Sequence, residues 1–288
     1  MSITLTLTWT LGRHGRPDPE RHPSYADRVL TTLPPRSALL ACWTTAWLAG
    51  EASLPELVGK VTAYDDEHTV RDLWVDDLAL EQAAGRLRAD GIGRVRLVLP
   101  APGDPLGLPG PGPFTTAALV AGEGVLAVRD DGSGHGLVPE LVNHGTELDG
   151  TVTTVVWQAF PIEVSGPEQG PFLHEAEHDL RLGVVEAAKS LQDLDVARWN
   201  PEIGDALHDL RRAARHGIDE DELPGFWPPR ARQVLVQARQ LAGVIQLAQQ
   251  DVGGSLDSRE AETRDRVLRE LARVVRRARV AAYNAVPE

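Results

Sequence analysis

Polar and apolar residues alternate strictly over the first eleven positions of the chain. Leu5, Leu7 and Trp9 fall on one side of the alternation, and a series of threonines falls on the other. A period of two residues is typical of a β-strand with one buried face, so the pattern predicts a strand over 2–11. The segment 12–35 that follows is rich in Arg, Pro and His without periodicity, and we expect a long loop or arm there.

Beyond this segment the apolar positions change between helical and strand spacing. A helical period over 37–48 ends at Gly50, and a second helix is predicted from Val75 to Asp90, before Gly91. Runs rich in β-forming residues predict strands at 94–100, 124–129, 136–141 and 151–162, with a hairpin turn at 130–134. Strands mixed with helices predict an α+β class, with a mixed α/β domain over 1–164.

The second half of the chain shows helical periodicity throughout. Its amphipathic stretches predict four helices, over 172–194, 200–217, 230–248 and 257–282. The second begins with Asn200 as N-cap and Pro201 at the first helical position. Because short connections join the four, we expect an all-α antiparallel helical bundle, a four-helix bundle-like domain over 172–288.

A segment dense in proline and glycine, 100–113, follows the strand predicted at 94–100. Proline or glycine stands at nearly every second position, which excludes a helix or a central strand. Phosphate-binding loops also follow strands, but this segment lacks the G-K-[ST] motif and its prolines remove backbone donors. We therefore expect an ordered surface loop that covers a groove between domains or contacts a partner.

Composition narrows the classes of function. The 288-residue chain suits two domains, and its formal charge of −13, shared by both halves, argues against a nucleic-acid partner. No apolar run has the length of a membrane span, and the N-terminus lacks the pattern of a signal peptide, so we expect no membrane partner. The single cysteine, Cys42, favours a reducing cytoplasm, and its apolar helical stripe predicts a core position.

One string in the chain has a known chemical meaning. Residues His174-Glu-Ala-Glu-His178 match H-E-x-x-H, in which zinc peptidases use the two histidines as metal ligands and the glutamate as general base. On an ideal helix the two imidazoles share one face, about 100 and 140 degrees from the apolar stripe that starts at Leu173. A chelating pair is therefore sterically allowed.

A third zinc ligand is needed, and one candidate has the required spacing. Glu202 stands 24 residues after His178, and residues 200–205 loosely resemble the second motif of the gluzincin family, apart from Pro201. The extension of the metzincins is absent, because Arg181 stands where their glycine would be. The resemblance implies a zincin-like hydrolase with His174, His178 and Glu202 as metal ligands.

The residues that flank the string favour a different interpretation. Zincin helices carry uncharged residues at the x positions, whereas Glu177 and Asp179 are charged here. We therefore interpret the string as a solvated helix face. The zinc-dependent metallohydrolase, with Glu175 as general base, is the alternative.

Two other charged groups have ordinary structural explanations. Arginines gather near the end of the last helix, where cations pair with acids one turn away, as with Glu270 and Arg273. The acidic run 219–222 lacks the alternate spacing of calcium ligands and predicts a solvated loop.

The sequence thus favours a cytoplasmic, non-catalytic protein-interaction or regulatory module without a cofactor, which engages another protein or a second copy of itself.

Overall fold

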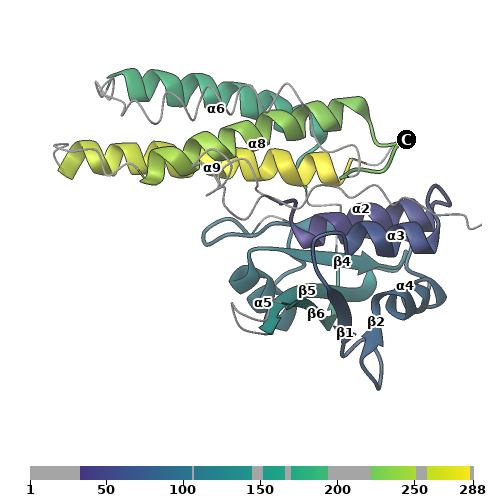
Figure 1. The fold of residues 1–288 in the computed structure, drawn as a ribbon. Helices are drawn as coiled ribbons and strands as arrows, with labels where there is room; N and C mark the ends of the chain where they lie inside the picture. The colour runs from purple at the N-terminus through teal and green to yellow at the C-terminus, as the bar shows by residue number, and fades with distance from the viewer. Residues whose placement is uncertain are drawn as a thin grey trace, which may run out of the picture.

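The computed structural model describes residues 33–105, 107–144, 152–165, 170–193, 222–250 and 258–285. The strand predicted at 2–11 and the helix predicted at 200–217 lie outside these residues. A six-stranded sheet occupies the N-terminal half, and the C-terminal half is helical (Figure 1). The predicted α+β class is therefore confirmed, with the sheet and the long helices in the expected halves.

The sheet is mixed, with one parallel pair of strands. Its strands are β1 (Glu67–Arg71), β2 (Leu78–Ala79), β3 (Arg94–Val98), β4 (Gly124–Val128), β5 (Ser133–His144) and β6 (Val152–Glu163). They are ordered β2-β1-β6-β5-β4-β3, with β1 parallel to β6 and the other neighbours antiparallel. The predicted hairpin turn joins β4 to β5, where Gly132 adopts a φ of 86° that a residue with a side chain rarely takes.

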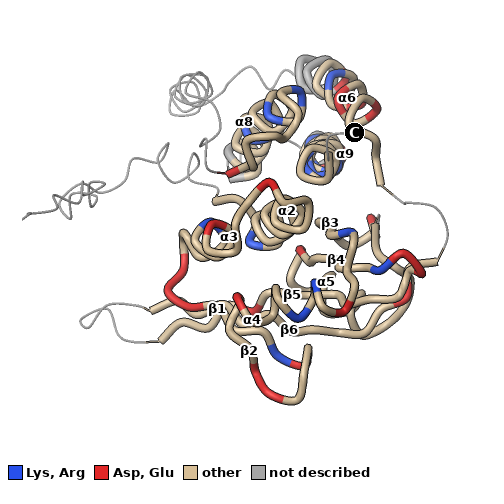
Figure 2. Tube along the Cα trace, turned by 90° about the vertical axis from the view of Figure 1, so that its right-hand side faces the viewer, with Lys and Arg blue, Asp and Glu red and all other residues tan. Residues whose placement is uncertain are grey.

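Four helices accompany the sheet: α2 (Arg36–Leu48), α3 (Leu54–Val61), α4 (Leu80–Ala89) and α5 (Pro113–Ala121). Of these, α2 contacts β3, β4 and β5 on one side and a C-terminal helix on the other. Figures 1 and 2 show α2 and α3 between the sheet and the C-terminal helices. Every residue of 37–44 is buried, because a helix that is apolar all round can be covered on all sides.

The N-terminal half differs from the sequence prediction in its short elements. The helix predicted from Val75 begins only at Leu80, and β1, β2, α3 and α5 were not predicted. Val75 is 88% exposed, and Trp74 packs under the guanidinium of Arg86 at 3.6 Å rather than in the core. The apolar residues before Leu80 therefore imitate a helical stripe while lying in a surface turn.

Three long helices form the described C-terminal half: α6 (Leu173–Asp193), α8 (Pro229–Gln250) and α9 (Ser258–Tyr283). Helix α9 packs against both α6 and α8 and runs antiparallel to them (Figure 1). At their N-terminal ends α6 and α8 meet through an ion pair between Glu177 and Arg230, 2.5 Å apart. Three of the four predicted helices are thus present, and the fourth member of the predicted bundle lies outside the described residues.

One hydrophobic cluster runs through both halves. It includes Trp157 of β6, Leu39 of α2, Trp227 before α8, and Val275 of α9. A smaller cluster, around Phe114 of α5, covers the opposite face of the sheet. Since α2 belongs to the shared cluster, the burial of its apolar surface depends on both halves of the chain.

Among the helices in the described ranges, none combines the length and the apolar character that a membrane span requires.

Candidate ligand-binding site between the two halves

The H-E-x-x-H string lies in the first turns of α6. His174, Glu175 and His178 are exposed, and the ring of His174 stacks on that of Phe172 with centroids 6.1 Å apart. Glu177 accepts hydrogen bonds from Arg181 and Arg230, each at 2.5 Å. The part of the chain that the structure describes contains no group of three or more His, Cys, Asp or Glu placed to hold a metal ion. Glu202 lies outside that part.

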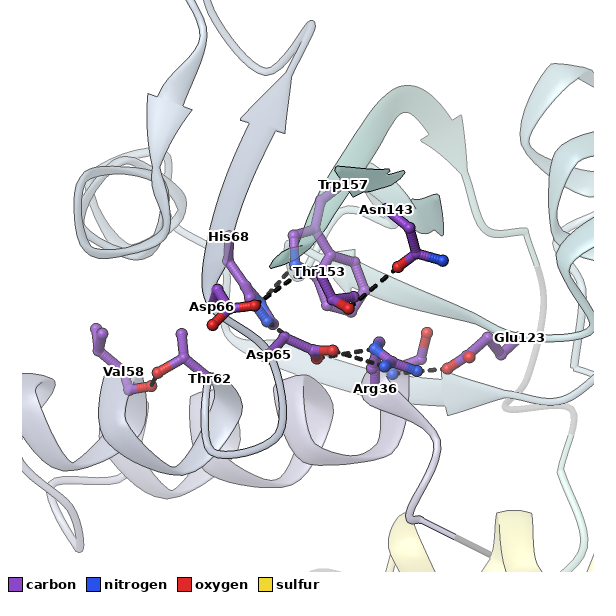
Figure 3. Close-up of polar contacts among 11 residues, drawn as sticks. Arg36, Val58, Thr62, Asp65, Asp66, His68, Glu123, Asn143, Thr153 and Trp157 are labelled. Atoms are coloured by element: carbon purple, nitrogen blue, oxygen red, sulfur yellow. Dashed lines mark hydrogen bonds and ion pairs between the residues drawn. The ribbon is translucent and has the colours of Figure 1, made fainter. Parts of the chain in front are cut away.

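A second polar group, absent from the sequence prediction, connects α2 to the sheet (Figure 3). Arg36 donates to both carboxylate oxygens of Asp65, at 2.8 and 2.6 Å. The Nε2 atom of His68 lies 3.4 Å from the same carboxylate, and Trp157 Nε1 donates to His68 Nδ1 at 3.2 Å. Because Nδ1 accepts, the neutral His68 ring carries its proton on Nε2, towards Asp65.

These contacts determine what His68 does chemically. Burial lowers the pKa of His68, and the charge of Asp65 opposes this shift only in part. A general base needs a nitrogen lone pair that reaches a substrate proton, but both ring nitrogens of His68 are engaged by protein groups. The contacts among Arg36, Asp65, His68 and Trp157 therefore fasten β1 to β6 and to the start of α2. At the start of α2, Glu123 also accepts a hydrogen bond from the backbone N–H of Ser37 at 2.8 Å.

A third polar group is buried beside the end of α9. Tyr283 donates its hydroxyl hydrogen to one carboxylate oxygen of Glu222, and Arg239 donates to the other. Burial raises the pKa of Tyr283 well above its ordinary value, and the charge of Glu222 raises it further. For Glu222, which is 2% exposed, the predicted solvated loop is wrong, because two donors offset the cost of burying its carboxylate. Residues 219–221 lie outside the described ranges.

The proline- and glycine-rich loop lies against α9. The carboxylate of Asp104 accepts from Arg276 at 2.6 Å and from Arg277 at 2.8 Å. Burial alone would raise the pKa of Asp104, but the hydrogen bonds from Arg277 and Arg276 outweigh it, and the pKa lies below the ordinary value. Arg273 pairs with Glu270, as predicted. Two of the clustered arginines thus bind the N-terminal half rather than acids of their own helix.

A cavity of about 610 Å³, which we call the junction cavity, lies where the halves meet. It is lined by Gly93–Arg96 at the start of β3, by Gly170–His174 at the start of α6, and by the end of α9 with Asn284. Arg94, Arg96 and His174 belong to its lining, and no Asp or Glu is among the described lining residues. The sequence indicates His174 only as a candidate metal ligand. It distinguishes neither arginine, because both alternate with apolar residues as in any surface strand.

The fold and this cavity define a two-part α+β protein with a potential ligand site at the junction of its parts. The chain belongs to the Rv1486c-like protein family: the model of the N-terminal domain matches residues 37–171 and that of the C-terminal domain matches 174–280. The junction cavity includes residues from both matched segments and from the short stretch between them.

Relatives of the chain occur in mycobacteria. It is 30% identical over 288 residues to "Uncharacterized protein Rv1486c" of Mycobacterium tuberculosis (strain ATCC 25618 / H37Rv), an alignment that covers 87% of this chain and 96% of the relative. It is 28% identical over 295 residues, with the same coverage, to "Uncharacterized protein ML1804" of Mycobacterium leprae (strain TN). No solved structure matches the chain.

Proposed function

We propose that the protein is a non-catalytic binding module, of the protein-interaction or regulatory kind, and that it binds its partner at the junction cavity. The observation that carries this proposal is the lining of the cavity, to which both halves contribute. A partner that contacts β3, α6 and α9 together senses how the halves are arranged, as a regulatory site requires. Exposed Phe172 at the rim provides an aromatic anchor of the kind that interfaces favour.

The polar groups of the described residues support a non-catalytic role. Both nitrogens of His68 and both carboxylate oxygens of Glu222 are bonded to other side chains. Burial raises the pKa of Cys42 well above its ordinary value, and the charge of Glu222 adds to the shift, so the reactive thiolate is disfavoured. His68, Glu222 and Cys42 are thus engaged in contacts that hold the fold together.

The alternative is a zinc-dependent metallohydrolase. Its support is the exposure of His174 and His178 one turn apart on α6, with Glu175 between them in sequence. This mechanism requires Glu202, or another acid, to complete the ligand set from outside the described residues. Bound zinc together with activity that is lost in Glu175→Gln would favour this alternative over our proposal.

Site-specific photo-crosslinking tests the proposal. A photoreactive phenylalanine analogue replaces Phe172 at the cavity rim, and a control carries it at Val120, which is 86% exposed on α5. We expect the analogue at 172 to join the chain to one defined protein or to a second copy, and Arg94→Gln to weaken this product. A monomer in light scattering that gives no such product, or gives it equally from position 120, would overturn the proposal.

A further inference from the structure

We propose that residues 72–77, which we call the β1–β2 turn, are a docking surface for a second protein. The partner presents an apolar pocket bordered by lysine or arginine side chains. The proposal goes beyond the proposed function, because the turn adjoins β2 whereas the junction cavity adjoins β3, and these strands are the opposite edges of the sheet. In Figure 1 the turn projects from the sheet on the side away from the C-terminal helices.

Two consecutive apolar side chains form the tip of the β1–β2 turn. Trp74 is 52% exposed and Val75 is 88% exposed. The other tryptophans of the described ranges are all buried: Trp43, Trp47, Trp157 and Trp227. Tryptophan is among the residue types enriched where protein interfaces gain most of their binding energy. The turn therefore offers a partner an aromatic anchor with an apolar neighbour.

Other exposed apolar residues in the described part of the chain do not form such a tip. Val120 of α5 has no large exposed apolar residue next to it in sequence. Leu182 and Val185 of α6 are exposed as well, but the surface of this helix continues into side chains outside the description. Among the described residues, only the β1–β2 turn presents two consecutive large apolar side chains to solvent.

Neighbouring contacts hold Trp74 in place in the unbound protein. The guanidinium of Arg86 on α4 lies over the indole ring, 3.6 Å from its centroid, and Arg86 Nε donates to Asp90 at 3.0 Å. Leu73, the preceding residue, is buried in the larger hydrophobic cluster and anchors the turn to the core. A side chain that is already ordered loses less conformational freedom on binding, so more of its contact energy appears as affinity.

The backbone of the turn has an uncommon conformation at its first residue. Asp72 has a φ of 59°, and no other residue except glycine has a positive φ in the described ranges. Its carboxylate accepts a hydrogen bond from the side-chain amide of Gln158 on β6, and Arg71 donates to Asp77 across the base of the turn at 3.0 Å. Such backbone conformations cost free energy and are concentrated at functional sites. The fold thus maintains an unfavourable conformation where the chain leaves β1 for the exposed tip.

The charge of the turn indicates the chemistry of its partner. Figure 2 shows its acidic residues in red at the bottom of the molecule: Asp72, Asp76 and Asp77. Asp77 pairs with Arg71, whereas the exposed Asp76 forms no ion pair or hydrogen bond within the described ranges. Negative charge beside an apolar tip favours cations around the partner's pocket. It disfavours nucleic acid, an anionic membrane and a second copy of this chain, whose formal charge is −13.

Selection from a random peptide library displayed on phage, against the full chain, tests the proposal. Peptides that also bind the Trp74→Ala variant are removed first. We expect the remaining binders to combine apolar residues with Lys or Arg. Isothermal titration calorimetry then measures the affinity of the synthetic peptides for the full chain, and this affinity should fall as the salt concentration rises, because part of the attraction is between exposed charges.

Matched variants locate the binding. Trp74→Ala should weaken it by about tenfold or more, as loss of an aromatic anchor does, and Val75→Ser should weaken it as well. Val120→Ala changes a side chain of similar exposure on α5 and should leave the affinity unchanged. Asp76→Asn should weaken binding by about threefold or more, whereas Glu262→Gln, which removes an exposed negative charge on α9, should not. Circular dichroism verifies that each variant is folded.

Several results would overturn the proposal. They are a selection that leaves no binder, binders without basic residues, equal effects of Val75→Ser and Val120→Ala, and equal effects of Asp76→Asn and Glu262→Gln. Oligomers in light scattering that dissociate in Trp74→Ala would show that a second copy covers the turn. Vesicles of phosphatidylcholine that bind the unchanged chain but not Trp74→Ala would show that a membrane does. Each of these results leaves the crosslink from position 172 unaffected, so the proposed function is tested separately.

Discussion

The side-chain amide of Asn284 forms two hydrogen bonds with the backbone of Leu97: Leu97 N–H donates to Oδ1 at 2.8 Å, and Nδ2 donates to the Leu97 carbonyl at 2.9 Å. Leu97 lies on β3, an edge strand of the sheet, and Asn284 directly follows α9. The amide thus replaces one residue of a missing neighbouring strand. An exposed edge invites pairing with other chains, so the C-terminal half protects the sheet of the N-terminal half.

Replacing Asn284 should weaken the whole fold. Asn284→Ala leaves two backbone groups of β3 without partners, which we expect to lower the free energy of unfolding by about 1–3 kcal/mol in urea titrations. Asn143→Ala removes an exposed side chain of β5 and is the control, with a smaller expected loss. Equal stability of Asn284→Ala and the unchanged protein would show that the amide does not hold the edge.

Acid should destabilise the protein through His68. Burial holds the pKa of folded His68 below the ordinary value of 6.5, so the unfolded chain takes up the proton first as the pH falls. The stabilisation is complete above about pH 6.5 and is lost between there and the lowered folded pKa, at about 1.4 kcal/mol for each pKa unit of difference.

Unfolding free energies measured from pH 7.5 to 5 test this prediction. His68→Gln should flatten the pH dependence in that range. His135, whose pKa is lowered by burial and by the charge of Arg129, contributes in the same direction, so a part of the slope should remain. The same slope in His68→Gln as in the unchanged protein would contradict the assignment.

The single thiol should report the opening of the junction. Cys42 on α2 is fully buried and contacts the backbone carbonyl of Tyr283, with its Sγ atom 3.2 Å from the oxygen. With its raised pKa, it should react with a disulfide reagent at least about a hundredfold more slowly in the native protein than in urea. Rapid labelling under native conditions would mean that the C-terminal helix does not cover α2.

The proline- and glycine-rich loop should become more mobile without Asp104. Asp104→Ala removes the carboxylate that binds Arg276 and Arg277, and we expect faster hydrogen exchange in peptides spanning 99–114. Stability should fall by about 1–2 kcal/mol, because the arginines are partly exposed and water compensates them in part. The control is Asp76→Ala, at an exposed turn, which should leave hydrogen exchange in 99–114 unchanged. An unchanged exchange rate in Asp104→Ala would contradict the contact between Asp104 and the two arginines.

The larger elements could be predicted from sequence because their periodic patterns extend over many residues. The apolar stripes of α2, α6, α8 and α9 extend over three or more turns, and the strands β3, β4 and β6 are rich in β-branched residues. Short elements such as α3, with eight residues, have too few positions to establish a period. The exposed Val75 extended the apparent stripe of α4 beyond its true start at Leu80.

The polar groups could not be predicted because their members are distant in sequence. Glu222 and Tyr283 are 61 residues apart, and Asp104 and Arg277 are 173 apart. Glu222 lies in an acidic run of the sequence and Arg277 in a basic run. Runs of like charge normally indicate that the side chains are exposed to solvent. Only the tertiary fold shows that each of these charges has a partner. Likewise, only the fold shows that β3 and α6 bring Arg94 and His174 to one cavity.

Native mass spectrometry with elemental analysis, on protein purified without a polyhistidine tag, tests the central claim most directly. The claim is that the chain binds a protein partner or a second copy of itself and performs no metal-dependent chemistry. We expect no stoichiometric zinc, and we expect Arg94→Gln to reduce the amount of any partner chain that co-purifies. Near-stoichiometric zinc that disappears in His174→Ala and His178→Ala, together with hydrolytic activity lost in Glu175→Gln, would contradict the claim.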